Sequence, residues 1–353
     1  MPSKPPSEAL AALADRGSPV SEEAWGDFWD RLSGKELHDG EALAVLVSLT
    51  TLTPDGASIA ALMRSLRERN PQPDPPPAPT VNIVGTGGGP STFNLSTASA
   101  FVGAALGARV IKTGSRAYKS RTGSVDLLDR LGVRMTSSYE QTEESLEAVG
   151  IACAGPFVYP KELRLLARTI LPFDMKTMGR FFNLVGPFLA AVPVTRQITG
   201  VSDHSILPTF QELANDDPTK DFWLCSNELG ADELLSIVES NVYDSARREE
   251  FTLKPKELGL GAGSFDDLLP VSDIDGTVDH FLALIGGDGP PAALDSIKLN
   301  AAAMAINAEV AKEWPEALQM AADAMTSGEA VRLVERLRAH GKAAAEAGSG
   351  SRA

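Results

Sequence analysis

Cysteine and histidine, which build disulfide frameworks and many metal centres, are scarce in this sequence. Two cysteines and four histidines occur among 353 residues. Cys153 and Cys225 lie far apart, and the histidines have no paired or i, i+4 spacing. Neither a disulfide scaffold nor a zinc site is therefore indicated.

Long apolar runs and positive charge are scarce too. No apolar stretch reaches the ~18 residues that a membrane span needs, and the N-terminus has no signal-peptide core. The 32 lysines and arginines are outnumbered by 47 aspartates and glutamates, and the formal net charge of −15 opposes general binding of nucleic acid or anionic lipid. With 43% hydrophobic and 22% charged residues, the composition is that of a globular protein. We therefore expect a cytoplasmic protein without a membrane partner.

The N-terminal part has the pattern of a helical domain. Residues 1–70 contain successive amphipathic stretches. Trp25, Phe28, Trp29 and Leu32 follow i, i+3, i+4 and i+7 spacing, which places them on one helical face. This stripe favours packing in a core or a subunit interface over a ligand site.

A proline-rich segment, residues 71–80, then predicts an extended hinge, because its prolines cannot propagate a helix. Residues 81–345 alternate short apolar segments with helical ones, which predicts an α/β domain around a mostly parallel sheet. Residues 346–353 are expected to form a disordered tail. The expected strands are 81–84, 108–112, 150–155, 194–201 and 221–226, and the expected helices include 96–107, 123–131, 141–149, 204–215, 293–312, 315–326 and 328–340.

The segment VNIVGTGGGPSTFNLSTASAFVG, residues 81–103, places a glycine cluster between a strand and a hydroxyl-rich helix start. Glycines let another molecule approach the backbone N–H groups, and a helix N-terminus favours an anion such as phosphate. The segment is not a dinucleotide fingerprint, since Pro90 replaces the third glycine, and it lacks the Gly-Lys-Ser/Thr of a Walker loop. By itself it is equally typical of a sharp turn without a ligand.

A second junction, VIKTGSRAYKSRTGSVDLL at residues 110–128, repeats the strand, loop and helix pattern. Lys112, Arg116, Lys119 and Arg121 concentrate positive charge there in an otherwise acidic protein. Adjacent strand-to-helix junctions of a parallel sheet lie at one edge, so we favour a shared phosphate site over a solvated basic loop.

Two adjacent acids, Asp232 and Glu233, are expected at a helix start in NELGADELLS. Most such acids only interact favourably with the helix dipole. Beside a polyphosphate, however, the two carboxylates and the hydroxyl of Ser96 would bind Mg²⁺, which prefers a few protein oxygens together with phosphate oxygens and water.

Five collinear stretches resemble the signature stretches of anthranilate phosphoribosyltransferases, which belong to the wider nucleoside phosphorylase/phosphoribosyltransferase group. They are NIVGTGGGPSTFNLSTASAF, VIKTGSRAYKSRTGSVDLL, RFFNLVGPF, GADELLS and IKLNAAAMA…SGEAVRLVERL. The resemblance covers nearly the whole chain and implies an all-helical domain, completed by helices from about 160–190 and joined by a hinge to a large α/β domain. It also implies a homodimer through the helical domain, which would give the stripe at Trp25 a partner.

The resemblance implies Mg²⁺-dependent transfer of a phosphoribosyl group from phosphoribosyl pyrophosphate to anthranilate, in tryptophan biosynthesis. The implied donor-binding residues are Gly85, Thr86, Gly87, Gly88, Gly89, Thr92, Asn94, Ser96, Thr97, Lys112, Arg116 and Ser120. The implied acceptor-binding residues are Thr113, Gly114, Ser115, Tyr159 and Arg168, with Arg164 as the alternative to Arg168. The implied metal ligands are Ser96, Asp232 and Glu233, and the implied catalytic residues are Lys112, Asp232 and Glu233.

The chain departs from the family pattern mainly around the acceptor. Thr113 and Ser115 replace a His and an Asn, Tyr159 replaces a His, and Gly89 replaces an Asp of the glycine loop. The acceptor is therefore expected to be anthranilate or a related aromatic amine or heterocycle. Two alternatives stay open, a nucleoside phosphorylase and a non-catalytic or nucleic-acid-binding relative, although the net charge opposes the latter.

Overall fold

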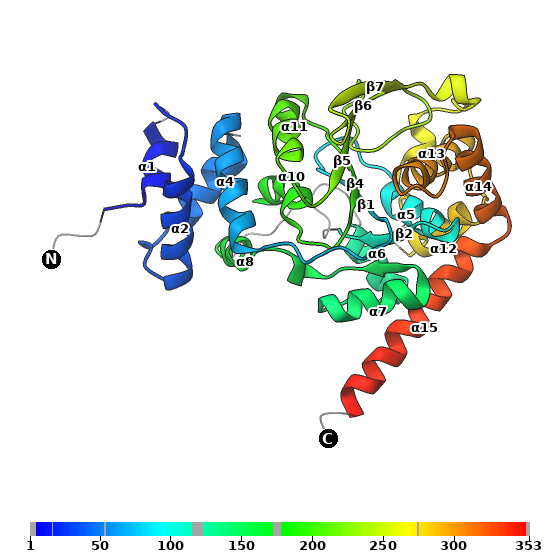
Figure 1. The fold of residues 1–353 in the computed structure, drawn as a ribbon, viewed down its shortest axis with the longest axis horizontal. Helices are drawn as coiled ribbons and strands as arrows, with labels where there is room; N and C mark the ends of the chain where they lie inside the picture. Colours follow the sequence, from blue (N-terminus) through cyan, green and yellow to red (C-terminus); the bar gives the residue numbers. More distant parts are fainter. Residues whose placement is uncertain are drawn as a thin grey trace.

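The computed structural model describes residues 5–15, 17–52, 54–114, 123–171, 178–273 and 275–350, without the side chains of residues 345 and 347–350. The chain leads from a group of N-terminal helices into an α/β body, and its last helix extends away from that body (Figure 1).

The N-terminal helices share one hydrophobic cluster with three helices from later in the chain. These helices are α1 (Glu8–Asp15), α2 (Glu22–Gly34), α3 (Glu41–Thr51), α4 (Gly56–Arg69), α8 (Lys161–Arg168), α10 (Arg180–Leu189) and α11 (Leu207–Asn215). The cluster therefore combines the expected helical domain with helices from the expected range 160–190, although its division from the α/β part at residues 71–80 stays a prediction.

The aromatic stripe of α2 lies in the core of the single chain. Trp25, Phe28 and Trp29 are completely buried. The two indole N–H groups donate to the carbonyl of Ser58 at 3.1 Å and to the hydroxyl of Ser65 at 3.0 Å. The stripe is thus core packing, and a partner subunit is not needed to bury it.

A seven-stranded sheet with the order β3-β2-β1-β4-β5-β6-β7 forms the centre of the α/β part. Its strands are β1 (Thr80–Gly85), β2 (Arg109–Lys112), β3 (Ile151–Cys153), β4 (Arg196–Gly200), β5 (Asp221–Asn227), β6 (Ser240–Asp244) and β7 (Glu249–Leu253). The first five are parallel neighbours, and all five were expected from their apolar segments. The predicted mostly parallel α/β architecture is therefore confirmed.

The antiparallel strands β6 and β7 were not predicted. Their sequences, SNVYD and EEFTL, contain Ser, Asn, Asp and Glu, which have low strand propensity, and part of each strand is exposed. Pairing with the edge of β5 stabilises these strands where local sequence does not.

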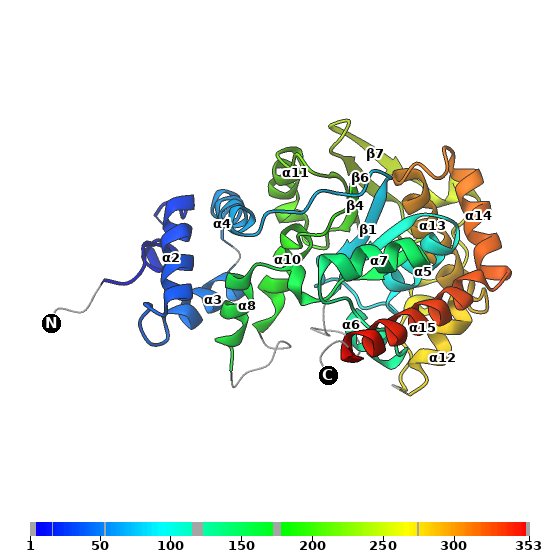
Figure 2. The ribbon, with the colours of Figure 1, turned by 60° about the horizontal axis from the view of Figure 1, so that its bottom comes forward.

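A second hydrophobic cluster joins the sheet to further helices, among which α5 packs along α13. These helices are α5 (Leu95–Ala105), α6 (Ser124–Arg130), α7 (Tyr139–Val149), α12 (Thr277–Ile285), α13 (Pro291–Asn307), α14 (Trp314–Thr326) and α15 (Glu329–Gly350). Helix α12 was not predicted, and α15 continues to Gly350, whereas a disordered tail was expected from residue 346. The alanines at 343–345, just before this stretch, favour helix, and residues 351–353 lie outside the described part. Figure 2 shows α15 projecting beside α7.

The parallel strands bring four loops to one edge of the sheet. Strands β1 and β2 are adjacent and parallel, so the loops that lead from them to α5 and α6 leave at the same edge. The loops after β4 and β5 leave there too. This carboxyl edge is where open α/β sheets bind ligands.

Candidate active site

The glycine loop after β1 lies directly on the acidic loop after β5. Gly87 and Gly88 have φ angles of 67° and 90°, which favour glycine. A Cβ atom on Gly85 would collide with the carboxylate of Asp232, and one on Gly89 would collide with the carbonyl of Gly230. The glycines therefore serve close approach between two chain segments, in addition to any approach by a ligand.

The acidic pair lies in a loop, so the prediction of a helix start at Asp232 and Glu233 is wrong. Two buried asparagine side chains bind the backbone of this loop instead. Asn227 donates to the carbonyls of Ala231 and Glu233, both at 3.1 Å, and Asn300 binds both the N–H and the carbonyl of Leu234. These bonds engage backbone groups of the loop in a non-helical conformation, which competes with a helix.

Both carboxylates point to the glycine loop and the start of α5. Gly87 N–H donates to Asp232 Oδ2 at 2.6 Å. The Thr92 hydroxyl donates to Glu233 Oε2 at 2.6 Å, and Ser96 N–H donates to Glu233 Oε1 at 2.9 Å. The predicted metal ligands Ser96, Asp232 and Glu233 are thus brought together.

Burial and mutual repulsion act on the protonation of this pair. Burial raises the pKa of Glu233 to about 8, and the neighbouring charge of Asp232 adds to the effect. Burial also raises the pKa of Asp232, against the hydrogen bond from Gly87. Two crowded carboxylates of this kind gain stability from an added cation.

Lys112 is a buried cation whose charge interacts with both carboxylates. It ends β2 with only 3% of its surface exposed, and its Nζ donates to the Thr113 carbonyl at 2.6 Å. Burial lowers the pKa of Lys112 to about 8, while Glu233 and Asp232 act to raise it. A single ammonium cannot balance the charges of both carboxylates when both acids ionise.

The first turn of α5 offers polar groups for an anion. Asn94 precedes the helix with φ 68°, and the hydroxyl of Thr97 is buried without a hydrogen-bond partner in the described part of the chain. A buried hydroxyl of this kind normally has a partner. Together with the positive end of the helix dipole, it fits a bound phosphate oxygen.

The predicted acceptor-binding residues that the structure describes are on separate elements and are not joined to the glycine loop by contacts like those of the acidic pair. The Thr113 hydroxyl accepts a hydrogen bond from Asn82 at 2.9 Å in a buried network, and Gly114 packs so closely on Ser124 that a Cβ would collide with it. Tyr159 is half-buried, and burial raises its pKa to about 12.

Arg168 is exposed in the last turn of α8, and the alternative Arg164 is exposed and donates to the Pro156 carbonyl at 3.2 Å. No contact among the described residues joins either arginine to the glycine loop. Ser115, Arg116 and Ser120, with Lys119 and Arg121, lie outside the described residues.

Two residues beside the glycine loop were not predicted. The Ser202 hydroxyl donates to the Gly87 carbonyl at 2.5 Å. Asn183 of α10 lies beside the same glycine: a Cβ atom added to Gly87 would be 3.4 Å from the Cβ atom of Asn183. Ser202 follows β4, so the rule that parallel strands end at one edge could have found it. Asn183 belongs to the quoted RFFNLVGPF stretch, but only tertiary packing brings it to the loop.

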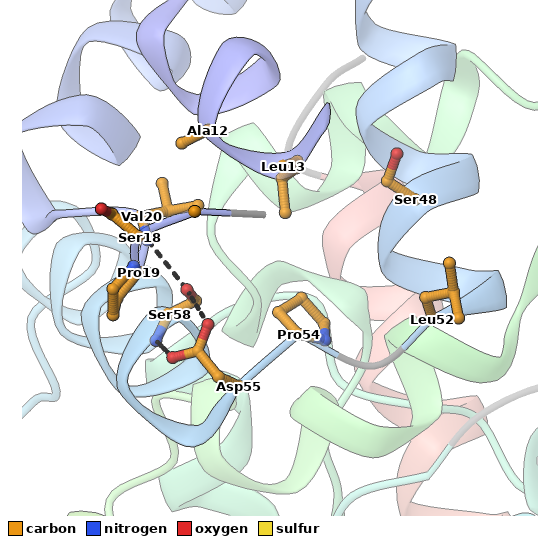
Figure 3. A pocket seen from close by; sticks show the side chains of 11 residues that line it. Ala12, Leu13, Ser18, Pro19, Val20, Ser48, Leu52, Pro54, Asp55 and Ser58 are labelled. Carbon is orange, nitrogen blue, oxygen red and sulfur yellow. Dashed lines mark hydrogen bonds between the residues drawn. The ribbon is translucent and has the colours of Figure 1, made fainter. Parts of the chain in front are cut away.

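A separate pocket in the N-terminal helices does not have this chemistry (Figure 3). It is lined by apolar side chains such as Leu13, Val20 and Leu52. Its carboxylate, Asp55, accepts from Ser58 N–H at 2.9 Å and from the Ser58 hydroxyl at 2.7 Å, which caps α4. This acid is therefore structural.

The fold and the site define the class of protein, and the comparisons agree. Residues 77–331 match the model of the "Glycosyl transferase family, a/b domain". The chain is a pentosyltransferase.

Individual relatives narrow the class. The anthranilate phosphoribosyltransferase of Desulfitobacterium hafniense is 30% identical over 94% of this chain and 98% of its own length. The anthranilate phosphoribosyltransferase of Thermomicrobium roseum is 31% identical over 90% of this chain and 96% of its own length. The crystal structure of the Thermus thermophilus enzyme superposes with a TM-score of 0.76 at 28% identity, covering 94% of this chain and 99% of that one. The chain belongs to the anthranilate phosphoribosyltransferase family.

Proposed function

We propose that the enzyme transfers a 5-phosphoribosyl group from phosphoribosyl pyrophosphate to an aromatic amine, anthranilate or a related acceptor, with Mg²⁺ as cofactor. The observation that carries this proposal is the contact between the glycine loop and the acidic pair. A fold neighbour, the enzyme of Saccharomyces cerevisiae, was solved in complex with this donor and Mg, with a TM-score of 0.75 at 22% identity.

The donor set fits Mg²⁺. Hard oxygen ligands are available from the carboxylates of Asp232 and Glu233 and from the hydroxyl of Ser96. Burial raises the pKa of both acids, so a bound cation would stabilise their ionised forms. Among the residues that the structure describes, no group of three or more His, Cys, Asp or Glu forms a complete metal cage. Mg²⁺ would thus be held jointly with the diphosphate, whose negative charge it would neutralise.

The chain's own residues position the donor. The glycine loop at residues 85–89 and the first turn of α5 follow β1 at the carboxyl edge, where they would bind the phosphates. Lys112 would add a positive charge as pyrophosphate leaves and positive charge develops at C1 of the ribose. The protein needs no strong base if the attacking amine is neutral, so catalysis consists largely of orientation and charge stabilisation.

The predicted acceptor-binding residues support acceptor substrates other than anthranilate as well. Thr113 replaces a larger side chain and its hydroxyl is held by Asn82, while Tyr159 offers a ring face and one hydroxyl. We carry the homodimer and the cytoplasmic location as proposals from the resemblance. None of the helices in the described part is long and apolar enough to cross a membrane.

The proposal is tested by calorimetric titration of phosphoribosyl pyrophosphate with Mg²⁺. The wild-type protein is expected to bind the donor, and Asp232→Ala/Glu233→Ala to lose binding by at least about 100-fold, because both buried carboxylates are removed. Glu143→Ala/Glu144→Ala, an adjacent exposed pair on α7, is the matched control and should bind normally.

A screen of aromatic amines and nucleobases, followed by pyrophosphate release, then identifies the acceptor. Normal donor binding by the Asp232→Ala/Glu233→Ala variant would exclude the metal assignment. Phosphate-dependent release of a base from a nucleoside, without use of the pyrophosphate donor, would select a nucleoside phosphorylase instead.

A further inference from the structure

A second polar cavity lies between the N-terminal helices and the sheet, at the end of β5 remote from the candidate active site. Its volume is about 300 Å³, the lower end of the range for small-molecule sites. It is formed by the start of α2, α4 and the segment after it, the end of α10 with the residues that follow, the end of α11 and the loop before β5. Figure 2 shows α4, α10 and α11 close together around this region.

The buried charges in this cavity do not balance. Lys220 is 5% exposed, lines the cavity, and has neither a hydrogen bond nor an ion pair within the described part of the chain. Its Nζ lies 5.8 Å from the centre of the Phe222 ring. Arg67 Nη2 is buried and has no hydrogen-bond partner there, and lies 3.5 Å from Asp217 Oδ2 in a long ion pair. Two cations thus share one buried carboxylate.

The other charged groups of the lining do not supply the missing negative charge. Asp217 Oδ1 is already bound by the N–H of Thr219 at 2.9 Å and by its hydroxyl at 2.5 Å. Asp216 is paired with Arg64 at 3.0 Å. Glu68 is exposed and Glu22 half-exposed, so both are solvated at the rim. Two largely buried cations that share one carboxylate are costly, and an anion in the cavity would balance the second positive charge.

The uncharged part of the wall is mixed. Phe188, Leu189, Leu213 and Pro218 give it an apolar side, and the polar side chains of Asn70, Gln72 and Thr219 also line the cavity. We propose that this cavity is a second ligand site, which binds a small organic carboxylate by placing its carboxylate on Lys220 and Arg67 and its apolar body against the apolar side of the wall. Inorganic phosphate lacks an apolar body and so fits less well.

This site is separate from the carboxyl-edge site. Lys220 precedes β5 and Asn227 ends it, and a strand of seven residues spans about 20 Å. The inference therefore does not rest on the proposed function, and its test can fail while donor binding is intact.

The test is calorimetric titration of the full-length protein with hexanoate, hexanamide and inorganic phosphate. Hexanoate is expected to bind at one site, and its neutral isostere hexanamide to bind at least about tenfold more weakly. Lys220→Met should weaken hexanoate binding at least about tenfold. Lys342→Met, which removes an exposed lysine of α15, should not change it.

The melting temperature separates loss of the site from misfolding. Lys220→Met should melt no lower than the wild type in buffer, since it replaces a buried unpaired charge, but hexanoate should no longer raise its melting temperature. Equal binding of hexanoate by the wild type and Lys220→Met, or no binding by the wild type, would overturn the proposal. Binding of phosphate but not hexanoate would overturn the assignment to an organic carboxylate.

Discussion

Glu233 shows how the surroundings of a single side chain prepare it for a ligand. Its two carboxylate oxygens accept from the Thr92 hydroxyl and from Ser96 N–H, and yet burial beside Asp232 raises its pKa to about 8. The hydrogen bonds are too few to offset the loss of solvent. Without a bound cation, the folded protein therefore keeps a proton on this residue near neutral pH.

The raised pKa predicts how the stability of the metal-free protein depends on pH. In the unfolded chain Glu233 ionises near its ordinary pKa of 4.5, whereas in the folded chain it does so near 8. Between these values the folded state binds more protons, so the free energy of unfolding should fall as pH rises from about 4.5 to about 8. Urea unfolding in EDTA at pH 5, 6, 7 and 8 measures this slope.

Glu233→Gln is the matched variant for this measurement, because glutamine has nearly the same shape and does not ionise. Its free energy of unfolding should depend less steeply on pH over the same range. Identical slopes in the two proteins would contradict the assignment.

At the scale of the elements, the ends of β1 and β4 are shaped to receive the acidic loop. A Cβ atom on Gly200, at the end of β4, would collide with the backbone of Asp232, and one on Gly85 would collide with its carboxylate. Two neighbouring parallel strands thus end in glycine at the points where the loop lies on them. The position of the acidic pair depends on these two contacts.

Gly200→Ala should therefore displace the acidic loop. We expect kcat/KM for phosphoribosyl transfer to fall about 100-fold, since a displacement of about 1 Å in a catalytic group has an effect of that size. Gly26→Ala is the control, because this glycine lies inside α2 with its nearest new neighbour at 3.7 Å. It should keep full activity and gain about 0.5–1 kcal/mol in stability. Steady-state kinetics and thermal unfolding measure both, and full activity in Gly200→Ala would contradict this role.

Elements with strong local patterns could be predicted from the sequence, and those that depend on tertiary partners could not. The apolar segments of β1 to β5 and the amphipathic helices between them are present as expected. The loop at Asp232 was taken for a helix because its acids resemble a first turn, but Asn227 and Asn300 bind its backbone. Asn300 lies 68 positions from Asp232 in the numbering, so no local pattern could reveal this contact.

At the scale of the whole molecule, the site lies where two parts of the chain meet. Helix α10 belongs to the hydrophobic cluster of the N-terminal helices, and its Asn183 lies beside the glycine loop of the α/β part. At the start of the same helix, Arg180 forms an ion pair at 3.5 Å with Asp203, which follows β4. Both parts of the chain thus contribute residues beside the glycine loop.

The part of the candidate site that lies on the quoted motifs could be predicted from the sequence, and the part that depends on helix packing could not. Residues on the quoted motifs, such as Gly85, Ser96 and Glu233, lie together because adjacent parallel strands end at one edge. Ser202 was missed although it obeys the same rule. Asn183 could not be found without the packing of α10, and the acceptor residues depend on how distant helices sit around the loop.

The central claim is that the loops at the carboxyl edge hold a phosphoribosyl donor together with Mg²⁺ on the acidic pair. The most direct measurement is a crystal structure of the enzyme soaked with phosphoribosyl pyrophosphate and MgCl₂. We predict diphosphate density over the glycine loop and a metal coordinated by Asp232 and Glu233. The account would be contradicted if the donor density lay at any other place, or if neither Asp232 nor Glu233 contacted a metal.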